Sequence, residues 1–298
     1  MKIANAPCSW GILEFGLEGE THTYQSMLTE MSETGYRGTE LGDWGFMPTD
    51  PAELRELLAG FGLSLVGAFV PVNFSDPAAH EEGVNAALKI ARLLSSTDPD
   101  HARIVLADEN GKSVNRTKKS GRILPEDGLS ADQWKVFASG VEKVAQAILD
   151  DTGLRSVFHH HCAGFVETPT EISTLLDLTR PELVSLCFDT GHFAYGGGDP
   201  VGGLNEYAGR LGHVHFKDFD RTIFEDTVKE ELDYFESVGR GIFCELGKGS
   251  VDFNAVLTEL RSQQFNDWIV VEQDVLPGMG SPRESALRNR QYLHSVGV

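Results

Sequence analysis

The sequence predicts a single-domain (β/α)8 barrel. Short apolar runs typical of strands alternate with longer amphipathic stretches typical of helices along all 298 residues. Eight such strand-like runs occur, and the links from each helix to the next strand are short. Strand–helix alternation with short links favours a parallel sheet, and eight units close most simply as a barrel of about 250 residues or more. The alternative, an open doubly wound sheet, usually carries a glycine fingerprint after its first strand, and CSWG (8–11) is not one.

The elements follow one another in a regular order. We expect strands at 3–7, 36–41, 64–70, 102–107, 155–161, 183–189, 213–217 and 268–273. We expect helices at 24–34, 51–60, 84–94, 131–150, 169–178, 204–209, 253–263 and 282–296. Several of these boundaries carry their own signals, which support the assignment.

Helix boundaries are marked by residues with known capping roles. Asp50-Pro51 and Thr168-Pro169 each place a capping side chain before a proline at the first helical position. Gly35, Gly62 and Gly153 stand where a helix should end before the next strand. These residues indicate where the expected helices begin and end between the strands.

Two stretches interrupt the regular alternation inside the single domain 1–298. Residues 107–130 are polar and rich in Lys and Arg, and residues 219–250 hold a helical segment (227–237) and a Gly-rich tail. Both follow the carboxyl end of an expected strand, the side on which barrel active sites form. They are either plain solvent loops or walls and lids of a site.

Composition excludes several classes of protein. Hydrophobic residues make up 41% of the chain and charged residues 23%, as in soluble globular proteins. The formal net charge is -20, which disfavours nucleic acid and anionic membranes as partners. The four cysteines (8, 162, 187 and 244) form no CxxC pair, and no signal peptide or membrane span is visible. We expect a cytoplasmic protein that forms homo-oligomers or stays monomeric.

The histidines are concentrated in one part of the chain. Six of the ten fall between residues 159 and 215, on or just after the ends of expected strands five, six and seven. They are His159, His160, His161, His192, His213 and His215. Such a concentration at strand ends points to a site at the barrel mouth.

Strand alternation sorts the polar residues at these ends. His159 and His161 share one face of strand five, and His213, His215 and Lys217 share one face of strand seven. Asp189 ends strand six and Glu272 ends strand eight.

In a closed barrel, neighbouring strand ends bring His159, Asp189, His215 and Glu272 together. Two carboxylates with imidazoles suit Mn²⁺, Co²⁺, Fe²⁺ or Zn²⁺, whereas Mg²⁺ prefers more oxygen ligands. We expect Mn²⁺ or Co²⁺. Each residue also has a simpler explanation: a satisfied strand histidine, a helix-capping aspartate, or a glutamate paired with Lys217.

Four segments resemble the xylose-isomerase-like superfamily of metal-dependent sugar isomerases and epimerases. They are HHHCAGFVET (159–168), CFDTGH (187–192), HVHFKD (213–218) and VVEQDVLPGMG (270–280). NAPCSWG (5–11), GYRGTELG (35–42), CELGKGSVDF (244–253) and RNRQYL (288–293) are similar to the inosose dehydratases within it, and the likeness covers nearly the whole chain. The resemblance implies dehydration of a keto-inositol.

The resemblance also implies ligands. The superfamily's aspartate, histidine and closing glutamate ligands fall on Asp189, His215 and Glu272. Its fourth ligand, a glutamate on strand five, has no counterpart here. The position falls on His159, with His161 and Glu167 as alternatives.

Loss of water beside a ketone needs a base, an acid and stabilisation of the enolate. We expect Glu272 to be the base, with Glu167 as second choice, and His161 or His192 to be the acid. Lys217 is expected to stabilise the negative charge on the enolate oxygen. The alternative is an ion pair with Asp218 or Glu272.

Substrate contacts are expected from residues beyond the early strands. Glu40 and His213 are assigned to hydrogen bonds with substrate hydroxyls, and Trp10 and Trp44 to an apolar wall against a ring face. The alternatives are a salt bridge from Glu40 to a neighbouring strand and packing of the two tryptophans in the core.

Three other functions compete with a dehydratase of a small polyol. The same centre could isomerise or epimerise a free ketose or keto-sugar. An apurinic endonuclease of this superfamily would need histidines on strands two and three and a basic groove, and this sequence has neither. A non-enzymatic scaffold would leave the imidazoles and carboxylates at four strand ends unexplained.

Overall fold

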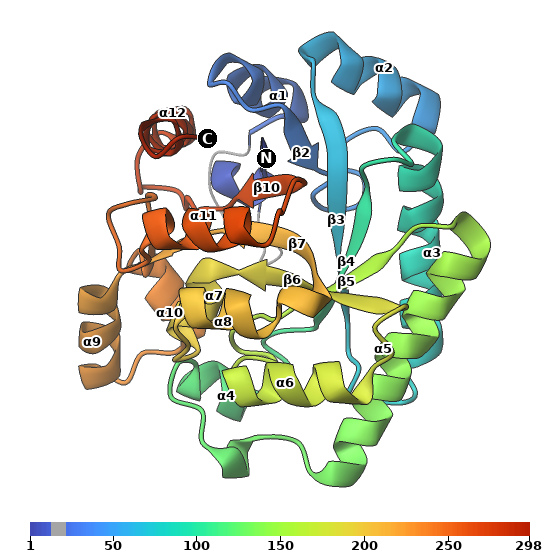
Figure 1. Ribbon diagram of the computed structural model, residues 1–298, viewed down its shortest axis with the longest axis vertical. Coiled ribbons are helices and arrows are strands. Elements are labelled where there is room, and N and C mark those ends of the chain that lie inside the picture. The colour runs from blue at the N-terminus through green and yellow to red at the C-terminus, as the bar shows by residue number, and fades with distance from the viewer. Residues whose placement is uncertain (13–21) are drawn as a thin grey trace.

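The computed structural model describes residues 1–12 and 22–298. Its centre is a closed barrel of eight parallel strands in the order β1-β10-β7-β6-β5-β4-β3-β2, with β1 pairing β2 to close the ring (Figure 1). The strands are β1 Lys2–Asn5, β2 Gly38–Glu40, β3 Ser64–Val72, β4 Arg103–Asp108, β5 Ser156–His159, β6 Val184–Asp189, β7 Leu211–Phe216 and β10 Trp268–Val271. The predicted (β/α)8 barrel is confirmed.

Helices surround the barrel on its outside (Figure 1). Those connecting successive strands are α1 Tyr24–Glu33, α2 Pro51–Phe61, α3 His80–Thr97, α5 Ala131–Thr152, α6 Pro169–Leu178, α8 Pro200–Glu206, α11 Phe253–Ser262 and α12 Pro282–Ser295. The helix expected at 204–209 is displaced, because Asp199 caps α8 and Pro200 starts it, and a short 3₁₀ turn follows at Ala208–Arg210.

The predicted capping residues act as expected. Asp50 accepts hydrogen bonds from the backbone N–H groups of Ala52 and Glu53 at the start of α2. Thr168 forms a capping box with Glu171 at the start of α6. Gly62 and Gly153 end α2 and α5 with φ of 67° and 73°, a conformation that glycine adopts without steric cost.

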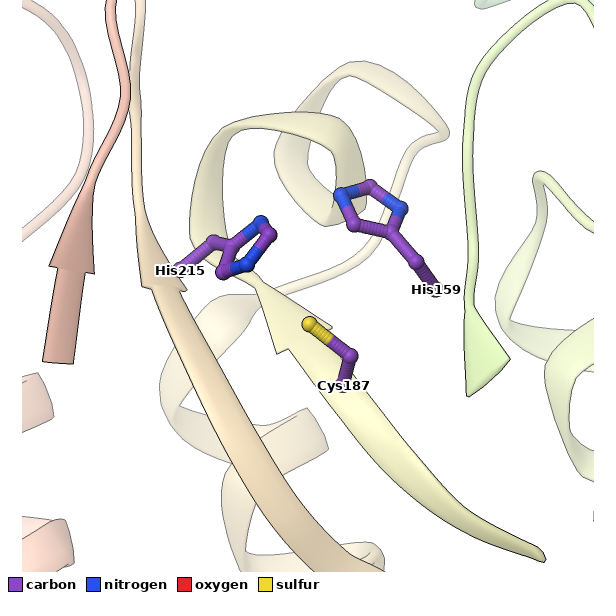
Figure 2. Close-up of side chains that lie close together, drawn as sticks. All are labelled: His159, Cys187 and His215. Atoms are coloured by element: carbon purple, nitrogen blue, oxygen red, sulfur yellow. The ribbon is translucent and has the colours of Figure 1, made fainter. Parts of the chain in front are cut away.

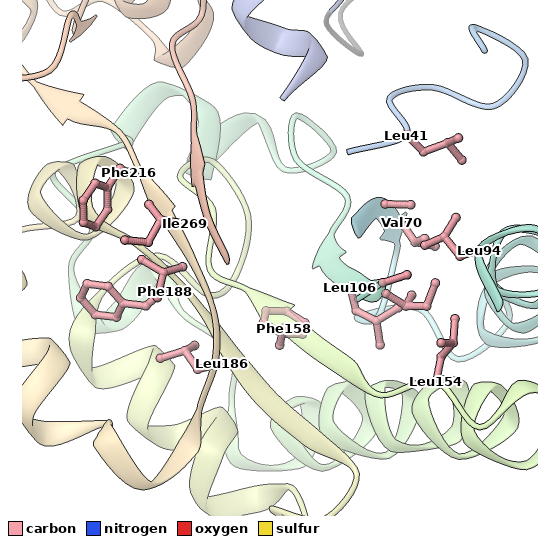
Figure 3. Close-up of a cluster of buried hydrophobic side chains, with 14 of the residues drawn as sticks. Leu41, Val70, Leu94, Leu106, Leu154, Phe158, Leu186, Phe188, Phe216 and Ile269 are labelled. Atoms are coloured by element: carbon pink, nitrogen blue, oxygen red, sulfur yellow. The ribbon is translucent and has the colours of Figure 1, made fainter. Parts of the chain in front are cut away.

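The core lies between the barrel and its helices (Figure 3). Leu106, Phe158 and Phe188 point outward from their strands into this layer, and each is fully buried. Burial of each such side chain contributes roughly 1.5–3 kcal/mol. Because strand side chains alternate, the intervening residues Val157 and Cys187 form a separate cluster inside the barrel.

Both predicted insertions lie at the carboxyl ends of strands. Residues 107–130 contain α4 Val114–Lys119, and residues 219–250 contain α9 Arg221–Lys229, α10 Tyr234–Gly239 and β9 Phe243–Cys244, which pairs antiparallel with β8 Asp218–Phe219. The single helical segment expected at 227–237 is wrong. The chain turns at Glu231, where φ is 55°, and Asp233 caps a new helix.

Within the described part of the chain, no helix has the length and apolar character needed to cross a membrane. This finding agrees with the hydropathy of the sequence.

Candidate metal centre and active site

Strand register brings the histidine and aspartate side chains to one level of the barrel. His159 of β5 lies opposite Cys187 of β6, and Asp189 at the end of β6 lies opposite His215 of β7. Val270 of β10 also lies opposite His215, so Glu272 follows just beyond the strand end. The alternation that turns Phe158 and Phe188 outward turns these polar residues inward.

Four side chains converge at this level. His159, Asp189, His215 and Glu272 each offer one ligand atom, and these atoms all lie within 4.8 Å of one another. Figure 2 shows the imidazoles of His159 and His215 approaching each other above Cys187. Asp189 Oδ2 lies 3.8 Å from His159 Nε2 and 3.9 Å from His215 Nδ1, and His215 Nδ1 lies 3.1 Å from Glu272 Oε1.

The donor atoms of this group suit a divalent metal ion. Asp189 Oδ2 and His215 Nδ1 are buried and have no hydrogen-bond partner among the described residues. Unpartnered buried polar atoms are costly, and a shared cation would satisfy both. Two carboxylate oxygens and two imidazole nitrogens are ligands for first-row divalent metals.

The electrostatics of the four side chains favour a cation. Burial raises the pKa of Asp189 to about 7, and the Glu272 charge acts in the same direction. Burial, together with the charge of His215, holds the pKa of His159 well below its usual value, so this imidazole is neutral. A neutral imidazole is the form that binds metals, and a cation would relieve the cost of ionising Asp189.

Two further groups of possible ligands share residues with this one. Cys187 lies with His159 and His215, and Glu40 with His213 and His215. Burial raises the pKa of the Cys187 thiol to about 12, so the thiol is protonated when no metal is bound. Cys187 was not predicted from the sequence as a site residue, although it lies two residues before Asp189 on the same strand face.

Lys217 links the four candidate metal ligands (His159, Asp189, His215 and Glu272, called the metal group below) to Asp274. Its Nζ donates to Glu272 Oε2 at 3.0 Å and to Asp274 Oδ2 at 3.4 Å. Although burial raises the pKa of a carboxyl group, the charges of His215 and Lys217 hold the pKa of Glu272 well below its usual value. Glu272 therefore has a positive partner at each oxygen: the His215 imidazole at Oε1 and the Lys217 ammonium at Oε2.

Glu40 reaches across the barrel interior from β2 to β7. Its Oε1 lies 3.1 Å from Nε2 of both His213 and His215. His213 is 2% exposed and lies against this carboxylate, not against open space. His213 therefore has this carboxylate as its partner, and Glu40 forms an ion pair, as the alternative expected. Because Glu40 also lines the cavity beside these residues, the expected contacts of Glu40 and His213 with substrate hydroxyls stay predictions.

The rings of His161 and His192 lie against each other, with centroids 4.0 Å apart and planes tilted by 40°. His161 Nδ1 lies 2.8 Å from the backbone oxygen of Cys162 and 3.3 Å from Asn110 Nδ2. Because the carbonyl oxygen in the shorter contact can only accept, Nδ1 carries the proton and the lone pair is on Nε2. Burial and the Lys217 charge lower the pKa of His161 to about 4. His192 is fully buried, and its Nδ1 accepts the backbone N–H of Cys162.

A cavity opens beside the metal group. Of the two imidazoles, His161 lines it in the described structure and His192 does not, so the role of His192 as an acid stays a prediction. Residues that sequence analysis missed also line the cavity, among them Asn110 after β4 and Asp274, two residues after Glu272. The lining is Ala6, Pro7, Cys8, Ile12, Glu40, Gly42, Asp43, Phe69, Asn110, His159, His161, Lys217, Tyr234, Glu272 and Asp274.

Glu167 lies outside the cavity. Its oxygens accept the backbone N–H groups of Gly121 at 2.6 Å and Ala163 at 2.8 Å, and the side chain is fully buried. A carboxylate used in this way holds two loops together and cannot reach a substrate carbon. The second-choice base and the alternative metal ligand at this position are both wrong.

The two tryptophans differ in position. Trp10 is 1% exposed in the main core, and its Nε1–H donates to Glu30, so the expected substrate wall is wrong there. Trp44 lines a hollow next to the cavity and stacks against the Lys89 ammonium. Its part in substrate binding stays a prediction.

Comparison with solved structures shows the same fold. A probable 3-DHS dehydratase from Bacillus anthracis superimposes with a TM-score of 0.72 at 14% identity, covering 99% of both chains. The IOLI protein, solved with a binding zinc atom, superimposes with a TM-score of 0.70 at 16% identity, covering 99% of this chain and 98% of that one.

Sequence relatives are closer. A protein of Geobacillus kaustophilus (strain HTA426) named inosose dehydratase is 32% identical over 292 residues, covering 98% of this chain and 93% of its own length. An inosose dehydratase of Lacticaseibacillus casei is 30% identical over 296 residues, covering 99% and 97%. The family model of the xylose isomerase-like TIM barrel matches residues 28–295. The chain therefore belongs to the inosose dehydratase family of hydro-lyases, within the xylose isomerase-like TIM barrels.

Proposed function

We propose that this protein removes water from a keto-inositol (an inosose) with the help of a divalent metal ion. One observation carries the proposal. The group His159, Asp189, His215 and Glu272 lies beside a cavity in a chain whose full-length relatives are named inosose dehydratase. The zinc atom in the structurally similar IOLI protein supports a metal in this fold.

His159, Asp189, His215 and Glu272 would hold the ion. When bound, a divalent cation polarises the substrate carbonyl and so acidifies the neighbouring C–H bond. Mn²⁺ and Co²⁺ suit this mixed oxygen and nitrogen set best, and Zn²⁺, Fe²⁺ and Mg²⁺ are the alternatives.

The reaction also needs a base beside the ketone. Glu272 was the first choice from the sequence, but its two oxygens face His215 Nδ1 and Lys217 Nζ. His161 has a free Nε2 in the cavity lining and a pKa of about 4, set by burial and the Lys217 charge, so it is neutral at pH 7. We assign the base to His161.

In the proposed elimination, one residue takes up the proton and later returns it. His161 Nε2 takes the α-proton. The electron pair of the broken C–H bond forms the C=C bond as the bond between the β-carbon and its hydroxyl breaks. The imidazolium of His161 returns the proton to that hydroxyl, which leaves as water. The enol product rearranges to a dione. The Lys217 ammonium, 3.0 Å from Glu272, holds the oxygen on which negative charge develops.

Incubation of the purified, metal-loaded protein with inosose tests the proposal. We expect a product about 18 Da lighter than the substrate by mass spectrometry, the mass of one water, with the ultraviolet absorbance of a conjugated dione. Free ketoses serve as the comparison, because isomerisation or epimerisation leaves the mass unchanged. Interconversion of a ketose with no loss of mass from inosose would favour the isomerase alternative instead.

A further inference from the structure

Glu40 contacts His215 at Nε2, the ring nitrogen that does not face Glu272. It stands at the end of β2, yet its Oε1 contacts two side chains of β7, on the far side of β1 and β10 in the barrel order. Glu40, His213 and His215 are 4%, 2% and 1% exposed. This contact therefore lies in the barrel interior, where a charge-assisted hydrogen bond is stronger than in water.

The bond determines which nitrogen of His215 is free. A carboxylate accepts hydrogen bonds, so Nε2 of His215 carries the proton that it donates to Glu40. In the neutral ring, the lone pair is then on Nδ1, the atom 3.1 Å from Glu272 Oε1 and 3.9 Å from Asp189 Oδ2.

We propose that Glu40 is a positioning residue that fixes the tautomer and ring orientation of His215, so that Nδ1 is presented to the divalent cation. The inference rests on the metal role in the proposed function. A carboxylate behind a metal-binding imidazole orients the ring and strengthens it as a ligand, and its loss typically weakens metal affinity 10- to 100-fold.

The neighbouring strand leaves room for this carboxylate. A Cβ on Gly67 of β3 would lie 2.9 Å from Glu40 Oε1, closer than real Cβ contacts come, and 3.3 Å from its Cδ, which is also tight. Glycine at position 67 thus permits the close approach of β3 to Glu40. His213 contacts the same oxygen at 3.1 Å, and so fixes its position from a second direction.

The test compares Co²⁺ binding by the metal-stripped full-length protein and its variants, without substrate. Titration calorimetry gives the dissociation constant and the stoichiometry. We expect Glu40→Gln, which keeps the shape and removes the charge, to raise the Co²⁺ dissociation constant roughly 10- to 100-fold at a stoichiometry of one. The matched control Asp43→Asn removes a carboxylate from the same cavity without touching His215, and should change the constant less than about 3-fold on the same scale.

Two further measurements separate positioning from a general loss of structure. In ¹⁵N-histidine NMR spectra of the metal-free protein, recorded at a pH high enough to make the His215 ring neutral, that ring should carry its proton on Nε2 in the wild type and become a mixture of tautomers in Glu40→Gln. Gly67→Ala keeps the charge but displaces Oε1, and should weaken Co²⁺ binding in the same direction.

Defined results overturn the inference. An unchanged Co²⁺ constant in Glu40→Gln refutes positioning while leaving the proposed function intact. Two Co²⁺ ions per wild-type chain that fall to one in Glu40→Gln would make Glu40 a ligand instead. A protein that binds Co²⁺ as expected but does not dehydrate inosose loses the proposed function alone.

Discussion

Asp189 divides its two oxygens between two tasks. Oδ1 accepts the backbone N–H of His192 at 2.7 Å and so caps α7 Thr190–Tyr195. Oδ2 has no hydrogen-bond partner in the described structure and faces His159 Nε2 and His215 Nδ1. Asp189→Asn retains an oxygen for the cap and removes the charged ligand, whereas Asp189→Ala removes both.

The expected size of the effect follows from binding linkage. A metal ion present at about 100 times its dissociation constant stabilises the native state by about 2.7 kcal/mol. If Asp189→Asn weakens binding at least 100-fold, the same metal concentration contributes only about 0.4 kcal/mol. Asp189→Ala should lose about 1 kcal/mol more than Asp189→Asn even without metal, because the cap is gone.

Thermal unfolding followed by circular dichroism measures both effects. The three proteins are compared in a chelator and in the same excess of Mn²⁺ or Co²⁺. We expect metal to raise the Tm of the wild type by roughly 5 °C and that of Asp189→Asn by less than about 1 °C. An undiminished metal-dependent shift in Asp189→Asn refutes the metal assignment. Equal stability of Asn and Ala variants in chelator refutes the capping role.

Three more perturbations test two buried groups outside the cavity lining and the role of Lys217. Arg116→Met leaves the buried Glu171 carboxylate without its bidentate partner at 2.7 and 2.8 Å, and should cost about 3–5 kcal/mol in urea unfolding; a loss below about 1 kcal/mol contradicts this. Burial raises the pKa of Asp108 to about 7, so between its unfolded value of 3.8 and 7 the native state binds more protons and wild-type stability falls as pH rises. Asp108→Asn should flatten that fall in unfolding midpoints measured from pH 4 to 8, and an unchanged slope would show that Asp108 does not cause it. Lys217→Met should lower kcat for inosose roughly 100- to 1,000-fold without weakening Co²⁺ binding, because the ammonium and the metal compete for Glu272; wild-type kcat would exclude Lys217 from the reaction.

The sequence by itself determined the barrel and predicted which side chains gather at its mouth. Local signals sufficed for the helix caps at Asp50 and Thr168, because a cap involves residues three positions apart. Strand alternation sufficed to turn Asp189 and His215 inward, because inward and outward positions repeat every two residues. It did not separate His159 from His161, which share one face.

Only the tertiary structure decided how the polar residues are used. Glu40 and His215 are 175 positions apart, and nothing local in either strand signals that one carboxylate serves two imidazoles. Glu167 looked like a second base until two backbone N–H groups proved to occupy its oxygens. Alternation assigns a residue to a face of its strand, but its partner across the barrel depends on closure and register. Those depend on the packing of all eight strands together.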